Sequence, residues 1–126
     1  GDTAVVTMVY ADGKIAVIKN SRRAAYGYDQ RIEILGSEGL LQAENITENS
    51  VVKSTKAGVL SAKPKYFFLE RYIDAFKAEW DAFVKSIHDN KPVPVTLEDG
   101  VAALAMAEAA TQSQKTGKTV QLKEIL

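Results

Sequence analysis

The chain has 126 residues, a length typical of one domain that buries about two thirds of its unfolded surface. Sixteen basic and sixteen acidic residues give a formal net charge of zero, so the composition indicates neither a nucleic-acid nor an anionic-membrane partner. The sequence has no apolar run of transmembrane length and no signal-type segment near its start. The absence of cysteine excludes disulfides and thiolate metal sites and is compatible with a cytoplasmic protein.

Two hairpins are predicted in the first part of the chain. Thr3–Tyr10 and Ile15–Ile18 flank an Asp-Gly turn, which is a strong signal for paired strands. Farther on, the turn Gly36-Ser37-Glu38-Gly39 should fold Leu40–Ala43 back on Ile32–Leu35. A further strand is expected at Val51–Thr55, followed by a loop or irregular edge over residues 56–64.

The segment between these hairpins carries polar groups that a strand does not need. Read with a period of two, Tyr26 and Tyr28 lie on one face of an extended segment and Gly27 lies on the other. The glycine would allow another backbone or a ligand to approach that second face. A strand with hydroxyls at one end and aliphatic residues at the other fits the rim of a polar-ligand pocket. The alternative is that both tyrosines merely pack on a sheet.

Helical patterns occupy the second half of the chain. Apolar residues from Phe68 recur at spacings of three and four and predict a helix that ends near Asn90. Thr96 to Asp99 has the form of a capping box and predicts the start of a second helix. Gly117 suits the C-cap of that helix, and Thr119–Leu122 is expected to form a last strand.

The expected fold class is therefore α+β, with a largely antiparallel open sheet and helices packed on one face. The first strand, Thr3–Tyr10, is apolar on both sides, and a sheet face without helices would expose apolar area. Face-to-face packing with another copy would bury that area, so we expect a homo-oligomer. A monomer with a sufficiently polar open face is the alternative.

Several kinds of catalytic and binding motif are missing from the sequence. There is no GxGxxG fingerprint after a strand, so this chain alone should not bind a dinucleotide. The single histidine, His88, has no carboxylate at a recognisable proton-relay spacing, and no helix carries a metal-ligand pattern. We therefore assign no catalytic, cofactor-binding or metal-ligating residue to this chain.

Two runs of sequence carry a resemblance to a known family. The run YGYDQRIEILGSEG and the later run YFFLERYIDAFKAEWDAFV resemble the C-terminal domain of myo-inositol 2-dehydrogenases. These enzymes belong to the Gfo/Idh/MocA-type family of two-domain, NAD(P)-dependent oxidoreductases, and the resemblance covers nearly all 126 residues. The GSEG turn and the ERY helix are general to that family, whereas the YGYDQR run is typical of the inositol branch.

The resemblance implies that residues 1–126 are a single substrate-binding and oligomerisation domain, from which an N-terminal dinucleotide-binding domain is absent. The start at Gly1 without methionine fits that expectation. The full enzyme would oxidise myo-inositol to the 2-keto inosose with NAD, as a dimer or tetramer. Its catalytic residues would precede this chain, which alone should be inactive.

The resemblance also implies that a tyrosine of the YGYD run contacts the inositol ring. We expect Tyr28 to bind substrate hydroxyls, with Tyr26 and Asp29 as further candidates. Phenols suit a polyol because they donate and accept hydrogen bonds without the desolvation cost of a buried charge. Two alternatives remain open: a related sugar or cyclitol oxidoreductase, and a non-enzymatic sheet-mediated assembly or carbohydrate-binding module.

Overall fold

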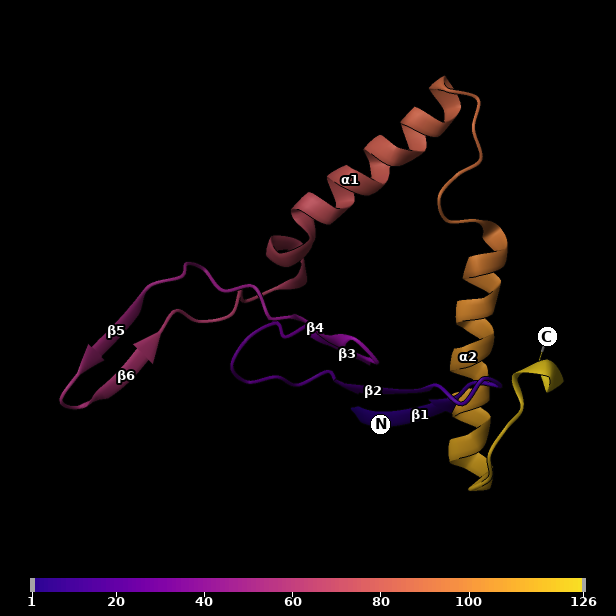
Figure 1. Cartoon of the computed structure of the whole chain (residues 1–126), viewed down its shortest axis with the longest axis horizontal. Coiled ribbons are helices and arrows are strands. Elements are labelled where there is room, and N and C mark those ends of the chain that lie inside the picture. The colour runs from indigo at the N-terminus through magenta and orange to yellow at the C-terminus, as the bar shows by residue number, and fades with distance from the viewer. Residues whose placement is uncertain (1, 126) are drawn as a thin grey trace. The chain divides into compact units, whose positions relative to one another are not determined.

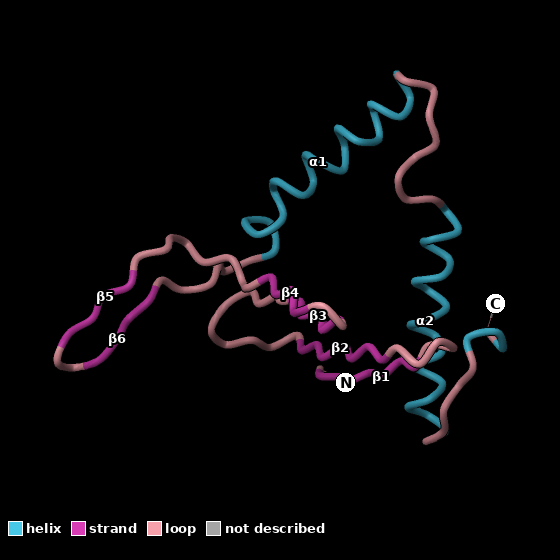
Figure 2. The backbone as a smooth tube through the Cα atoms, viewed as in Figure 1, coloured by secondary structure: helices cyan, strands magenta, loops and turns pink. Residues whose placement is uncertain are grey.

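The computed structural model describes residues 2–125 and confirms the α+β class (Figure 1). The strands precede the helices along the chain, as Figure 2 shows. Their bounds are β1 (Thr3–Val9), β2 (Ile15–Ser21), β3 (Ile32–Gly36), β4 (Gly39–Ala43), β5 (Val52–Thr55), β6 (Gly58–Ser61), α1 (Phe68–His88), α2 (Leu97–Thr116) and the 3-10 helix η1 (Leu122–Glu124).

The chain divides into two compact units. One contains Ile18–Lys77 with the first residues up to Val5, and the other contains Val6–Val17 with the residues from Ala78 onward. The first unit therefore holds β3 to β6 and the tyrosine segment, and the second holds α2 and η1. All residues of the candidate site described below belong to the first unit.

The strands pair as three hairpins. Strand β1 pairs with β2, β3 with β4, and β5 with β6; the register of the second pair sets Ile34 opposite Leu41. Among the described residues each ladder has two strands, so the single open sheet that we expected is divided into three. Part of the backbone between the ladders bonds to side chains, since Gln30 N–H donates to Asn45 Oδ1 and Val51 N–H donates to Asn49 Oδ1.

Two local predictions were wrong. Residues 58–61 form strand β6 rather than a loop, because Lys56 and Ala57 close a tight turn in which Thr55 faces Gly58. The last strand expected at Thr119–Leu122 is also missing from the described residues, where the 3-10 helix η1 begins at Leu122. Local bonds satisfy the backbone there, since Glu124 N–H donates to Gln121 O and Ile125 N–H to Leu122 O.

The predicted helices are confirmed together with their ends. Helix α1 ends at His88, and Asn90 takes a left-handed φ of 50° while Lys91 N–H donates to Ser86 O at 2.9 Å. Among residues 2–125, neither helix has the length and apolarity needed to cross a bilayer. Ala105 on α2 and Ser86 on α1 are the buried residues of the described part, and both lie in the second unit.

The capping box of α2 gives a first testable prediction. Asp99 N–H donates to Thr96 Oγ1 at 3.3 Å, and Thr96 N–H donates to Asp99 Oδ2 at 2.8 Å. Replacing Thr96 by Ala is expected to lower the free energy of unfolding in urea by about 1 kcal/mol, since one helix-end donor loses its acceptor. The control is Thr111→Ala inside α2, which removes the γ-methyl and a hydroxyl bonded to Ala107 O and should leave stability unchanged or slightly raised. Equal losses in both variants would contradict the capping role.

Candidate functional site

The tyrosine segment is a turn and an irregular stretch, not the strand that we predicted. Tyr26 and Gly27 lie in a turn in which Gly27 N–H donates to Ala24 O at 3.2 Å. Gly27 has a φ of 125°, which interrupts an extended run, and β3 begins only at Ile32. The two tyrosines therefore do not share a strand face.

The close approach expected at Gly27 is confirmed, and the group that approaches is the chain at residues 64–65. A Cβ at Gly27 would lie 3.1 Å from Lys65 O and 3.2 Å from Pro64 Cβ. Next to it, Tyr28 N–H donates to Lys65 O at 2.8 Å. A side chain at residue 27 would therefore compete with the hydrogen bond that holds Tyr28.

A third segment, residues 46–48, forms hydrogen bonds with residues 63–65. Lys65 N–H donates to Ile46 O at 3.3 Å, and Glu48 N–H donates to Lys63 O at 3.1 Å. Thr47 and Pro64 form an antiparallel bridge between these bonds. Residues 63–65 thus connect the tyrosine segment to residues 46–48 through backbone hydrogen bonds, although these segments are distant in sequence.

The Tyr28 ring is half-buried and packs its edge against Tyr72 of α1, with ring centroids 5.7 Å apart and an interplanar angle of 78°. The Tyr72 hydroxyl donates to Gln30 Oε1 at 2.6 Å. Hydrogen bonding with Tyr72, followed by burial, raises the pKa of Tyr28, and the positive charge of Arg71 opposes that rise. Tyr28 therefore remains a neutral phenol at neutral pH and can both donate and accept.

Tyr26 and Asp29 belong to a second group of contacts. The Tyr26 hydroxyl donates to Asp29 Oδ2 at 2.6 Å, and Arg31 binds both Asp29 oxygens, at 3.0 and 2.9 Å. The bond from Tyr26, with that from Arg31, lowers the pKa of Asp29, while the same bond to Asp29 raises the pKa of Tyr26. Asp29 is thus an ionised carboxylate, and its side chain is only 15% exposed.

An open hollow of about 390 Å³ adjoins this second group. It is lined by Tyr26, Asp29, Arg31, Glu44, Asn45, Thr47 and Pro64. The structure thus brings Tyr26 and Asp29 together at one hollow, whereas the ring of Tyr28 packs against Tyr72. Of the three residues expected to bind substrate, Tyr26 and Asp29 bond to each other, whereas Tyr28 has Tyr72 as its side-chain partner.

The bond from Tyr26 to Asp29 gives a second prediction. A carboxylate with a lowered folded-state pKa stabilises the fold above the unfolded-state pKa, and this contribution is lost as the pH falls through the lowered value. Tyr26→Phe removes the largest cause of the lowering, so the pKa of Asp29 should rise toward its ordinary value. The stabilising contribution should then be smaller and be fully lost at a higher pH than in wild type. Carbon-13 NMR titration of the Asp29 carboxyl measures the change. Tyr66→Phe, at a tyrosine that is 80% exposed, is the control and should leave the Asp29 curve in place.

Sequence reasoning missed three polar residues of this region. Tyr72 lies in the segment from Phe68 for which the sequence predicted only a helix with an apolar stripe, yet its hydroxyl reaches Gln30. Asn45 follows β4 and donates from Nδ2 to Tyr28 O at 3.0 Å. Gln30 lies within the YGYDQR run, and its period-two position gave no sign of a bond to a helix. All three depend on contacts between distant segments, for which the sequence pattern contains no signal.

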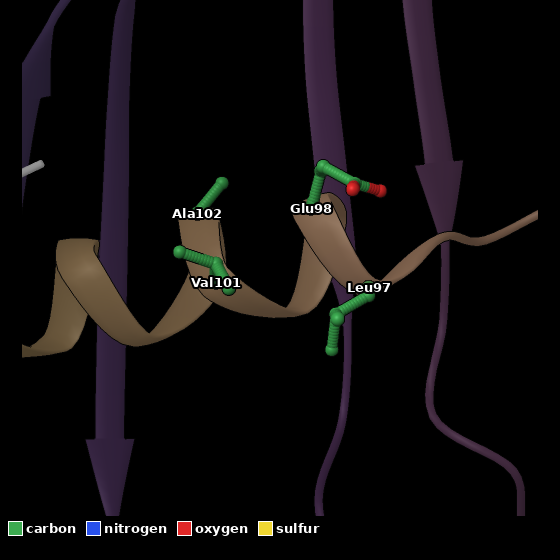
Figure 3. Close-up of a pocket in the computed structure, with 4 residues that line it drawn as sticks. All are labelled: Leu97, Glu98, Val101 and Ala102. Carbon is green, nitrogen blue, oxygen red and sulfur yellow. The ribbon is translucent and has the colours of Figure 1, made fainter.

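A second hollow lacks the convergent polar groups of a ligand site. It has a volume of about 350 Å³ and lies along the first turns of α2, where Figure 3 shows its four lining residues, Leu97, Glu98, Val101 and Ala102. All four come from one helix, and Glu98 alone is charged. A specific ligand site needs several convergent polar groups. Among the described residues, no group of three His, Cys, Asp or Glu side chains could hold a metal ion either.

The helix N-termini of this chain do not fit the pyrophosphate of a dinucleotide. A helix start binds phosphate through free N–H groups and a positive dipole end. At α2 the Asp99 side chain accepts from Thr96 N–H, and Glu98 adds a second negative charge. At α1 the first turn carries Glu70. These carboxylates would repel a phosphate at both helix starts.

Comparison with known families gives one match across nearly the whole chain. Residues 1–122 match the family described as "Oxidoreductase family, C-terminal alpha/beta domain". The match covers both hairpins that flank the tyrosine segment, the segment itself and both α-helices.

Individual relatives and solved structures agree with this match. Myo-inositol 2-dehydrogenase from Thermotoga maritima is 43% identical over 125 residues, which are 99% of this chain and 37% of the relative. A myo-inositol dehydrogenase structure from Corynebacterium glutamicum has 43% identity and a TM-score of 0.88, covering 94% of this chain and 36% of its own. A scyllo-inositol dehydrogenase structure from Lactobacillus casei, with bound NAD(H) and scyllo-inositol, has 32% identity and a TM-score of 0.87, covering 97% and 36%. The chain therefore spans little more than a third of each.

Proposed function

Because this chain belongs to the oxidoreductase family whose C-terminal α/β domain it matches, we propose that it is the substrate-binding and oligomerisation domain of an NAD-dependent inositol 2-dehydrogenase. The intact protein would oxidise myo-inositol to the 2-keto inosose. The observation that carries this proposal is the group formed by Tyr28, Tyr72 and Gln30, two phenols and a carboxamide in contact. It occurs in a chain 43% identical to a myo-inositol 2-dehydrogenase.

The proposed role of these side chains is to bind and orient a polyol. Tyr28 is the principal substrate-binding residue, because its phenol is half-buried, neutral and able to donate and accept. Tyr26 and Asp29 are further candidates, since both line the open hollow. The Tyr26 hydroxyl already donates its proton to Asp29, so toward a sugar hydroxyl Tyr26 would act as an acceptor. Directed bonds of this kind distinguish inositol isomers better than apolar contact does.

The cofactor would be bound by a part of the intact protein outside this chain. The described residues offer no fit for its pyrophosphate, whereas the Lactobacillus casei neighbour holds NAD(H) in a chain that extends well beyond the matched part. We therefore assign no cofactor contact and no catalytic residue to this chain, which alone should be inactive. The proposed compartment is the cytoplasm, with which the lack of cysteine is compatible.

Apolar side chains on the β3–β4 ladder support the proposed assembly into a homo-oligomer. Leu35 and Leu41 are 82% and 70% exposed, and their register positions place them on opposite faces of the ladder. Apolar area on a ladder is commonly covered by another sheet. Light scattering on the intact protein would show a dimer or tetramer, and a monomer would contradict this part of the proposal.

The experiment that tests the function measures NADH formation by the intact protein. The substrates are myo-inositol, scyllo-inositol, chiro-inositol and glucose at equal concentration. We expect turnover with an inositol well above that with glucose. Turnover with glucose and with no cyclitol would retain the family and overturn the substrate. Failure to bind NAD would overturn the enzymatic function and favour a carbohydrate-binding or assembly module.

A specific observation favours one second candidate. The Lactobacillus casei neighbour at 32% identity carries scyllo-inositol, an epimer of myo-inositol. A related cyclitol oxidoreductase would keep the same fold and the same tyrosine contacts. The substrate series separates the two candidates, because an enzyme of the second kind would oxidise scyllo-inositol faster than myo-inositol.

A further inference from the structure

The Asn45 side chain makes three hydrogen bonds, all of them to backbone groups. Its Nδ2 donates to Tyr28 O at 3.0 Å, and this bond is partly buried. Its Oδ1 accepts from Gln30 N–H at 3.3 Å and from Ile46 N–H at 3.0 Å. A backbone carbonyl only accepts and an N–H only donates, so these partners fix which amide atom is nitrogen. Asn45 is therefore held in a single orientation across the tyrosine segment.

This amide completes the backbone bonding of Tyr28. Tyr28 lies outside every helix and strand, so no regular ladder satisfies its N–H and C=O. Its N–H donates to Lys65 O at 2.8 Å, and its C=O accepts from Asn45 Nδ2. The backbone of Tyr28 is thus tied on one side to the segment before α1 and on the other to the end of β4.

The same amide also bonds to the residue whose side chain reaches Tyr72. Asn45 Oδ1 accepts from Gln30 N–H, and Gln30 Oε1 accepts from the Tyr72 hydroxyl. Because Tyr72 packs against the Tyr28 ring, the Asn45 amide is connected to Tyr28 in two ways. It bonds directly to the Tyr28 backbone, and it is linked to the ring by way of Gln30 and Tyr72. Loss of this amide would free the backbone at residues 28 and 30 together.

We propose that Asn45 is a positioning residue, which fixes the direction of the Tyr28 phenol for the substrate through the backbone bonds of its amide. The inference rests on the proposed function, in which Tyr28 binds inositol. Binding groups must be held by their supporting contacts to within a fraction of an ångström, because a directed hydrogen bond weakens steeply with misalignment. Asn45 supplies this support from the segment that follows β4, which lies outside the tyrosine segment.

Two variants of the intact protein distinguish the loss of the amide's hydrogen bonds from added repulsion at Tyr28 O. Asn45→Asp keeps the size and an acceptor for Gln30 and Ile46, but it places a carboxylate oxygen against Tyr28 O in place of the donor. Asn45→Ala removes all three bonds without adding repulsion. We expect Asn45→Asp to raise the Michaelis constant for inositol by about fivefold and Asn45→Ala by less, with little change in kcat or in the constant for NAD.

Asn49→Ala is the matched control. Asn49 Oδ1 also accepts a nearby backbone N–H, that of Val51, at 2.9 Å, but its side chain has no bond to the tyrosine segment. The Michaelis constant should stay within about twofold of wild type in this variant, since Asn49 is exposed and its side chain does not bond to the segment proposed to bind substrate. An effect equal to that of Asn45→Ala would show a general loosening of the loop and would overturn the proposal.

A double-mutant cycle with Tyr28→Phe gives the deciding result. If Asn45 acts through Tyr28, adding Asn45→Asp to Tyr28→Phe should raise the Michaelis constant by less than about twofold further. Full additivity would overturn the positioning role while leaving Tyr28 as a binding residue. An unchanged constant in Tyr28→Phe alone would overturn the assignment of Tyr28 and, with it, the positioning role. A folding defect in Asn45→Ala would not affect this cycle, because the cycle uses the near-isosteric Asn45→Asp.

Discussion

Replacing Tyr28 by Phe in the intact protein is expected to raise the Michaelis constant for inositol by about tenfold, the equivalent of one hydrogen bond of about 1.4 kcal/mol. The variant retains the ring and therefore the edge-on packing against Tyr72, so the protein should still fold. Only the phenol oxygen is lost. Steady-state kinetics with varied inositol at saturating NAD measures the change.

The control for this variant is Tyr66→Phe, which removes the same hydroxyl from a tyrosine that is 80% exposed. It should leave both the Michaelis constant and kcat unchanged. If Tyr28→Phe lowers kcat and leaves the Michaelis constant unchanged, the phenol acts in the transition state alone, and the binding role proposed for Tyr28 is wrong. Identical kinetics in the two variants and in wild type would remove Tyr28 from the site.

Replacing Gly27 by Ala is expected to destabilise the protein by about 3 kcal/mol, at the upper end of the cost of a strained backbone position. Two causes add together. Gly27 has a φ of 125°, which residues with a Cβ rarely adopt, and the new Cβ would lie 3.1 Å from Lys65 O. That carbonyl cannot move away freely, because it accepts the hydrogen bond from Tyr28 N–H.

Gly58→Ala is the matched control for the contact at Gly27. Gly58 has a φ of 135°, and a Cβ at this residue would meet no atom within 4 Å, so the substitution has the same backbone strain without the steric contact. We expect it to cost about 1.5 kcal/mol in the free energy of unfolding measured with urea. A difference of less than about 0.5 kcal/mol between the two variants, within ordinary additivity error, would show that residues 64–65 do not pack closely on Gly27.

The parts of the fold that could be predicted from sequence are those with local causes. The turn at Gly36–Gly39 joins two strands of equal length, and the capping box fixes the start of α2 through bonds between Thr96 and Asp99. In each case, residues that are close together in the sequence determine where an element begins or ends. The strand over residues 58–61 was missed because its turn, Lys56-Ala57, lacks the residues that mark tight hairpins, and Gly58 with Pro64 indicated a loop or an irregular edge.

The candidate site was only partly predictable because its contacts are not local. Period-two reasoning placed Tyr26 and Tyr28 on a strand, whereas Gly27 takes a positive φ and a distant carbonyl takes the Tyr28 N–H. Alternating polarity cannot show that a segment bonds to a loop from elsewhere in the chain. The close approach at Gly27 could be predicted, since a missing side chain is visible in the sequence. The identity of its neighbour, Lys65, could not.

The bonds around residues 63–65 also determine how the tyrosine segment behaves over time. An irregular loop usually exchanges its amide hydrogens with water almost as fast as an unfolded chain does, because it opens at little cost. Here the amides of Tyr28 and Lys65 lie outside every helix and strand, yet each donates to the carbonyl of another segment. Neither amide can open unless the segment that accepts from it separates. We therefore expect the amide of Tyr28 to exchange as slowly as that of a strand residue, although its segment is an irregular loop.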